Sequence, residues 1–209
     1  MIEDFSENKI QNIIREEGLE VCVISYGGCG SNRLTQKLMH NNYKAKTTIW
    51  DKILCHCPEI IRFDIPIIYI YRNPIHALLS MKRRGHGIWD KNQKKMSNNS
   101  EIELSDENLL QLMIRHFNMW TTCDFNCILI IKYEELFRDT IIHKLSGFLD
   151  NPNLLHFPVD YIEPNITDDY ISENIDESTK QLLVKYEKEI NEINNYIPLD
   201  ICKYHKEGL

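Results

Sequence analysis

Long apolar runs are missing from this sequence of 209 residues. No stretch approaches the roughly 18 consecutive apolar residues that a transmembrane helix needs, so we expect no membrane span. The opening residues MIEDFSENKI are acidic and polar, whereas a secretory signal needs an apolar core. This end of the chain therefore predicts a cytoplasmic location.

Patterned cysteines and an excess of positive charge are also missing. None of the seven cysteines has C-x-x-C spacing, and the triplet Cys55-His56-Cys57 lacks the separated ligands of a zinc site. We therefore expect reduced thiols and no metal. Because the net charge is −7, we expect no nucleic-acid partner, and any anion site must be a local cluster of positive charge.

Short apolar runs alternate with segments of helical periodicity along the whole chain. The runs predict strands at 19–25, 50–57, 65–72 and 127–133. The periodic segments predict helices at 5–17, 32–40, 73–84, 105–123, 139–150 and 177–195. This alternation is typical of an α/β fold, so we expect one domain over residues 1–209 with a central parallel sheet flanked by helices.

Residues at the predicted helix starts support these assignments. Asn73 is placed to cap the helix that begins with Pro74, Ser105 is placed to cap the next one, and Ser31 or Asn32 is the expected cap of the helix at 32–40. In contrast, residues 85–104 are rich in glycine, lysine, asparagine and serine, which predicts a mobile surface insertion.

A glycine-rich turn follows the first predicted strand, in the stretch VISYGGCGSNRLTQKL (23–38). A turn of this kind directs backbone N–H groups and a helix dipole at one point, which favours an anion. The lysine of a nucleotide-hydrolysing loop is missing, since Gly30 is followed by Ser31, Asn32 and Arg33. The alternative is a tight turn whose glycines only permit close packing.

A second strand-to-helix turn contains Arg72 at the end of the strand IPIIYIYR and Ser80 in the following helix. Carboxyl ends of parallel strands share one sheet edge, where α/β sheets bind ligands. Two such turns provide two anion sites on one sheet edge, with the Arg72 guanidinium and the Ser80 hydroxyl available to one phosphate. The alternatives are a surface salt bridge for Arg72 and a solvent-facing serine.

Four segments in order resemble the sulfotransferase family that uses 3′-phosphoadenosine 5′-phosphosulfate (PAPS). They are CGSN (29–32), IPIIYIYRNPIHALLS (65–80), ILIIKYEELFRDT (128–140) and KLSGFLD (144–150). The resemblance implies an architecture like that of P-loop NTPases, PAPS as co-substrate and 3′-phosphoadenosine 5′-phosphate (PAP) as product. It also implies a hydroxyl or amine acceptor on a small molecule, glycan or peptide.

The resemblance also implies roles for single residues. The 5′-phosphosulfate loop would consist of Gly27, Gly28, Cys29, Gly30, Ser31, Asn32 and Arg33. Arg72 and Ser80 would bind the 3′-phosphate, and Tyr133 would contact adenine or serve only in packing. The stretch LCHCP (54–58) resembles the family segment whose histidine is the general base, so His56 is either that base or a structural histidine.

One departure from the family affects the expected activity. Family members carry lysine or arginine where this chain has Gly28, and that cation normally contacts the bridging oxygen of the leaving group. A non-catalytic protein that binds PAP or another nucleotide on the same fold is therefore the first alternative function. A divergent P-loop kinase is the second.

Overall fold

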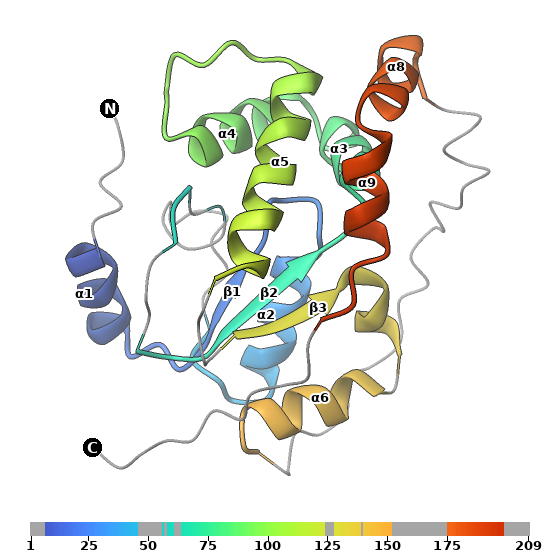
Figure 1. Cartoon of the computed structure of the whole chain (residues 1–209). Helices are drawn as coiled ribbons and strands as arrows, with labels where there is room; N and C mark the ends of the chain where they lie inside the picture. The colour runs from blue at the N-terminus through green and yellow to red at the C-terminus, as the bar shows by residue number, and fades with distance from the viewer. Residues whose placement is uncertain are drawn as a thin grey trace.

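A computed structural model of the chain describes residues 7–45, 56, 58–60, 64–123, 128–138, 140–151 and 175–198. Its centre is a parallel sheet in the order β1-β2-β3, made of β1 (Cys22–Ile24), β2 (Ile67–Tyr71) and β3 (Ile128–Lys132) (Figure 1). The predicted α/β fold with a parallel sheet is confirmed for these residues. The strand predicted at 50–57 lies outside them, apart from His56.

Helices surround this sheet, and apart from the additional α4 they follow the order of the predicted ones (Figure 1). They are α1 (Glu7–Glu17), α2 (Ser31–His40), α3 (Pro74–Arg83), α4 (His86–Ser97), α5 (Asp106–Thr121), α6 (Thr140–Phe148), α8 (Glu177–Lys185) and α9 (Glu187–Asn194). A 3-10 helix, η1 (Tyr133–Phe137), continues directly from β3. The helix predicted at 177–195 is divided at Tyr186, which ends α8 and precedes α9.

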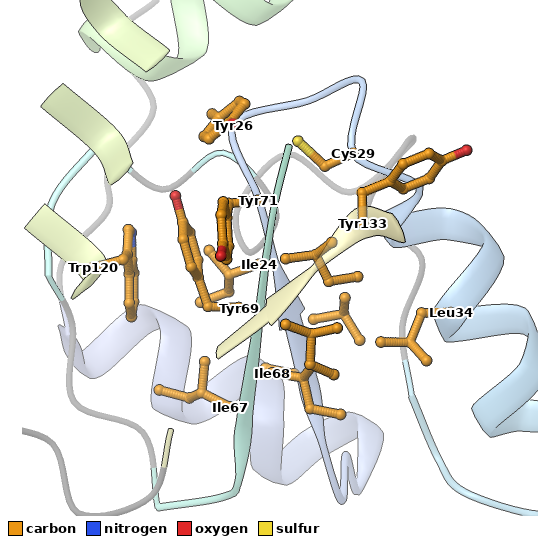
Figure 2. Close-up of a cluster of buried hydrophobic side chains, with 14 of the residues drawn as sticks. Ile24, Tyr26, Cys29, Leu34, Ile67, Ile68, Tyr69, Tyr71, Trp120 and Tyr133 are labelled. Atoms are coloured by element: carbon orange, nitrogen blue, oxygen red, sulfur yellow. The ribbon is translucent and has the colours of Figure 1, made fainter. Parts of the chain in front are cut away.

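The central strand β2 is buried on both faces, which explains its continuous apolar sequence. Tyr69 stacks on Trp120 of α5 with ring centroids 6.1 Å apart. Figure 2 shows Ile68 on the opposite side of the strand, toward Leu34 of α2. The sheet therefore separates α5 from α2, and side chains on both sides form the main core.

Two of the three predicted helix caps are confirmed. The Asn73 side chain accepts from the backbone N–H of Ile75 at 2.9 Å, and the Ser105 hydroxyl accepts from that of Asn108 at 3.1 Å. The predicted cap of α2 is wrong, because the helix begins at Ser31 and its N-cap is Gly30 in the left-handed conformation. Glycine adopts this conformation at no steric cost.

The segment 85–104 is not the mobile insertion that its composition predicted, because it contains α4 packed against α3 and α5. Trp89 donates from Nε1 to Asp106 Oδ1 at 3.1 Å, and Gln93 Oε1 accepts from the backbone N–H of Ser105 at 3.2 Å. These contacts stabilise a helix whose own sequence is mostly polar. Among the described residues, no helix combines the length and apolar character that crossing a bilayer requires.

Candidate functional site

The candidate site lies at the carboxyl end of the sheet, where the chain leaves β1, β2 and β3. Figure 2 shows Tyr26, Cys29 and Tyr133 together at this end, above the buried side chains of the strands. Because all three strands are parallel, the segments that follow them meet at one edge. The structure therefore brings the glycine-rich turn close to Arg72 and Tyr133.

The glycine-rich turn fits closely against its neighbours. Gly28 has φ +67°, and a Cβ at this position would lie 2.6 Å from the carbonyl oxygen of Ala77 in α3. Gly30 has φ +76°, and its Cβ would lie 2.6 Å from the Tyr133 ring. Both positions thus require glycine, so the packing role that the sequence left open is real. The same turn leads into α2, whose first-turn N–H groups carry the positive end of the helix dipole.

Short side chains fix the shape of this turn from within. The Ser25 hydroxyl accepts from the backbone N–H of Gly27 at 3.3 Å and donates to the Ser31 hydroxyl at 3.2 Å. The Cys29 thiol is fully buried and donates to the carbonyl of Gly27 at 3.0 Å. Cys29 is not in a disulfide, and neither are the other described cysteines, Cys22 and Cys123.

Tyr26 links the turn to the end of β2. Its phenol oxygen accepts from the backbone N–H of Arg72 at 2.8 Å and donates to the carbonyl of the same residue. Burial raises the pKa of Tyr26 well above its ordinary value, so the phenol keeps the proton that it donates. The backbone of Arg72 is therefore fixed against the glycine-rich turn. Nothing in the sequence except the position of Tyr26 directly after a strand indicated this role.

The two residues expected at the 3′-phosphate are both buried. Arg72 is 3% exposed, so it is not a surface side chain, and its guanidinium lies 4.2 Å over the Tyr133 ring. Ser80 is 2% exposed in α3, on the helix face that also carries Ala77 and Met81. Because a Cβ at Gly27 or Gly28 would contact Met81 or Ala77, this face points toward the turn.

Tyr133 packs within the protein rather than standing free at the surface. It is 5% exposed, with the Arg72 guanidinium over its ring and its edge against Gly30. The Phe137 ring meets it in a T-shaped contact with centroids 5.2 Å apart, and the Arg33 guanidinium lies 5.1 Å from the Phe137 centroid. The packing interpretation of Tyr133 therefore applies, and a contact with adenine stays a prediction.

His56 lies beside the turn in the form that a general base needs. Its Nδ1 is 2.8 Å from the carbonyl oxygen of Ser25, which can only accept, so Nδ1 carries the proton and Nε2 keeps its lone pair. The pKa of His56 is lowered to about 4, chiefly because burial disfavours the charged ring. The bond to Ser25 opposes this effect, and the Lys95 ammonium adds a smaller lowering contribution. The imidazole is therefore neutral at pH 7.

Helix α4 also contributes to the site, which the sequence did not indicate. A Cβ at Gly27 would lie 2.7 Å from the Asn92 amide nitrogen and 3.2 Å from Cε1 of His56. Asn92 is 7% exposed, and Lys95 follows it by one helical turn, on the same face. Among the described residues, Arg33, Arg72 and Lys95 thus place positive charge near the turn.

The basic run at 82–84 belongs to a different cluster. Lys82 donates to Asp106 at 2.7 Å and to Asp176 at 3.1 Å, while Arg83 and Arg84 are exposed. Lys82 therefore serves the packing of α3 against the segments that follow. Within the described ranges, no group of three or more histidine, cysteine or acidic side chains is arranged to hold a metal ion.

Comparison with known proteins identifies no relative. No protein-family model, no curated protein and no solved structure matches the chain.

Proposed function

We propose that the protein transfers a sulfuryl group from PAPS to a hydroxyl or amine of a small molecule, glycan or peptide, and releases PAP. The observation that supports this most is the meeting of three features at one sheet edge. These are the glycine-rich turn before α2, the buried Arg72 after β2, and the neutral His56 whose Nδ1 donates to Ser25.

In this proposal, one group of residues binds the 5′-phosphosulfate and another binds the 3′-phosphate. The N–H groups of Gly28 to Gly30 and of the first turn of α2 bind the 5′-phosphosulfate, whereas the N–H of Gly27 already donates to Ser25. Arg72 and Ser80 bind the 3′-phosphate, with the guanidinium supplying two parallel hydrogen bonds. Arg33, at the start of α2, adds positive charge near the nucleotide.

His56 has the catalytic role in the same proposal. The acceptor oxygen or nitrogen attacks sulfur, and the bond between sulfur and the bridging phosphate oxygen breaks. Nε2 of His56 takes the proton that the acceptor loses, and the electron pair of the broken bond leaves on PAP. The group transferred to the acceptor is SO₃, so no oxidation or reduction takes place.

The alternative of a non-catalytic PAP-binding protein has one observation in its favour. Gly28 occupies the position of the family's cation, and its contact with the Ala77 backbone leaves no room for a side chain there. Charge on the leaving oxygen would then have to come from α2, Arg33 or Lys95. A P-loop kinase has no comparable support, since the lysine of its loop is missing.

Ligand-dependent melting provides the first test. A ligand that binds only the folded state stabilises it by RT ln(1 + [L]/Kd), so PAP should raise the melting temperature more than AMP or ATP at equal concentration. Equal shifts with all three would contradict a specific site for the 3′-phosphate.

A transfer assay then separates the candidate functions. Labelled PAPS is incubated with a panel of phenols, sugars and peptides, and the products are analysed. Label on an acceptor supports sulfuryl transfer, whereas PAP binding without transfer to any acceptor supports the non-catalytic alternative. Phosphate transfer from labelled ATP to the same panel would instead support a kinase.

A further inference from the structure

Arg72 and Tyr133 are neighbours because of the sheet register. Tyr71 of β2 pairs with Lys132 of β3. The residues that follow them, Arg72 and Tyr133, therefore leave the sheet side by side. The guanidinium of Arg72 lies 4.2 Å over the Tyr133 ring as a result. The two side chains therefore form a stacked cation–aromatic pair at the end of adjacent strands.

Both ends of Arg72 are fixed by aromatic residues. Tyr26 bonds to its backbone N–H and carbonyl, and Tyr133 covers its guanidinium. Tyr133 is itself fixed, since Phe137 packs on it and Gly30 lies against its edge. An arginine whose side chain is already ordered loses less conformational freedom when it binds a phosphate.

We propose that Tyr133 is a positioning residue, which holds the Arg72 guanidinium in the orientation that binds a 3′-phosphate and thereby sets the preference for PAP over AMP. This inference rests on the proposed function and differs from a contact between Tyr133 and adenine. PAP and AMP share adenine and the 5′-phosphate, so an adenine contact would contribute equally to both. A residue that orients Arg72 contributes only to PAP.

The test compares Tyr133→Leu with the matched control Tyr133→Phe, which keeps the ring. Calorimetric titration measures the affinity of each variant for PAP and for AMP. Tyr133→Leu should weaken the binding of PAP by about 3- to 30-fold, the range expected for a cation–aromatic contact. It should change the affinity for AMP much less. Tyr133→Phe should keep the ratio of PAP affinity to AMP affinity that the wild-type protein has. Looser packing of the turn at Gly30 would lower the affinity for both ligands alike. The ratio of the two affinities therefore isolates the effect on Arg72.

A double-mutant cycle shows whether Tyr133 acts through Arg72. In an Arg72→Ala background the guanidinium is gone, so adding Tyr133→Leu should leave the PAP-to-AMP ratio unchanged. A further fall in the ratio in that background would show that Tyr133 acts on the 3′-phosphate by another route and would overturn the inference.

The remaining outcomes separate this inference from the proposed function. Equal losses of PAP and AMP in Tyr133→Leu would overturn the positioning role while leaving a PAP site in place. If the wild-type protein showed no preference for PAP over AMP, that result would overturn the proposed function and this inference with it. If Tyr133→Leu does not fold, Phe137→Leu removes the T-shaped support of the Tyr133 ring. Phe137 also lies under the Arg33 guanidinium, so Arg33→Ala is its control for losses common to both ligands. Phe137→Leu should lower the ratio of PAP affinity to AMP affinity more than Arg33→Ala does, and an equal ratio in the two variants would contradict the inference.

Discussion

At the scale of single residues, the proposed chemistry depends on the protonation state of His56. An unperturbed imidazole has a pKa near 6.5 and would be partly charged at neutral pH. Burial in this protein lowers the pKa of His56 to about 4. The bond to Ser25 also selects the tautomer whose Nε2 can accept a proton. The residue is therefore available as a base over the whole physiological pH range.

This protonation state predicts the pH dependence of turnover. With PAPS and a suitable acceptor, the rate should stay level from pH 8 down to about pH 5.5 and fall only as the pH approaches 4. His56→Ala should lower turnover by about 10²- to 10⁴-fold with little change in PAP affinity. The control is His40→Ala, since His40 is exposed and its Nδ1 also contacts a backbone carbonyl. A rate that declines around pH 6.5, or full activity in His56→Ala, would contradict the assignment.

Lys95 supplies a second prediction, which needs no acceptor. Its positive charge disfavours the imidazolium form of His56, so Lys95→Met should raise the pKa of His56 toward its ordinary value. Titration of the His56 ring protons by NMR measures this directly. Lys94→Met is the matched control, because Lys94 is the neighbouring residue of α4 and is exposed. An unchanged His56 titration in Lys95→Met would show that the charge of Lys95 does not reach the site.

Arg72 and Ser80 should contribute unequally to PAP binding. Arg72→Ala should weaken the binding of PAP by about 2 to 4 kcal/mol, the scale for removing one partner of a buried charge pair. Arg72→Lys should recover only part of this, because lysine makes no bidentate contact and does not stack in the same way. Ser80→Ala should cost about 1 kcal/mol, the value of one hydrogen bond. Calorimetry on the three variants tests the order, and unchanged affinity in Arg72→Ala would place the 3′-phosphate elsewhere.

Residues of the candidate site differ in how far the local sequence reveals them. The glycine-rich turn, Arg72 and Ser80 follow local rules, because a strand end and the helix after it are visible in the sequence. His56 was a candidate only through the family resemblance, and its low pKa depends on burial that no local pattern reports. Tyr26 acts on a residue 46 positions away, so its role requires the folded sheet.

At the scale of elements, the fit between the glycine-rich turn and α3 decides what the turn can carry. The turn touches α3 with backbone rather than side chain, since a Cβ at Gly28 would lie 2.6 Å from Ala77 O and 2.9 Å from Ala77 Cα. Backbone atoms of a helix cannot move aside as a flexible side chain can. Introducing a cation at this position by Gly28→Lys is therefore expected to disturb the turn and, under the proposed function, not to improve turnover.

Alanine substitutions test this fit. Gly28→Ala should destabilise the protein by more than about 2 kcal/mol, because the positive φ alone costs roughly 1 to 2 kcal/mol for a residue with a Cβ and the clash adds to it. The control is Gly87→Ala, an exposed position in α4 with no atom within 4 Å of a Cβ. In a helix this change should stabilise by about 0.5 to 1 kcal/mol. Urea unfolding measures both, and a Gly28→Ala protein of normal stability would contradict the close packing.

The helices show why some elements could be predicted and α4 could not. The cap at Asn73 and the apolar strand β2 are local signals, and both are confirmed. Helix α4 has few apolar residues, and its buried polar side chains Asn92 and Gln93 are accommodated by other segments. Its stability therefore comes from tertiary contacts, which a polar composition does not reveal.

At the scale of the whole molecule, two apolar clusters share the same helices. The main core includes Leu109 of α5, and the adjacent Leu110 belongs to a second cluster with Ile75, Leu182 and Ile190. Helices α3 and α5 contribute side chains to both clusters. Lys82 of α3 reinforces this arrangement through its ion pairs with Asp106 and Asp176. The site and the C-terminal helices α8 and α9 are thus joined through two common elements.

This sharing predicts that the chain unfolds as one cooperative unit. Leu182→Ala in the second cluster should destabilise the protein by about 2 to 5 kcal/mol, the range for removing a buried leucine side chain, and should leave the affinity for PAP unchanged. The control is Val184→Ala on the same helix, since Val184 is 78% exposed and its truncation should change stability by less than about 0.5 kcal/mol.

Circular dichroism and tryptophan fluorescence follow this unfolding together. Trp89 and Trp120 report on α4 and α5, near the main core, whereas the substitution lies in α8. If the clusters unfold together, both signals should change in one transition, which Leu182→Ala moves to lower denaturant concentration. PAP should move that same transition in the opposite direction, in both the unchanged protein and the variant. An early loss of helical signal in Leu182→Ala, followed by a normal fluorescence transition, would show that α8 and α9 unfold independently and would contradict a single domain.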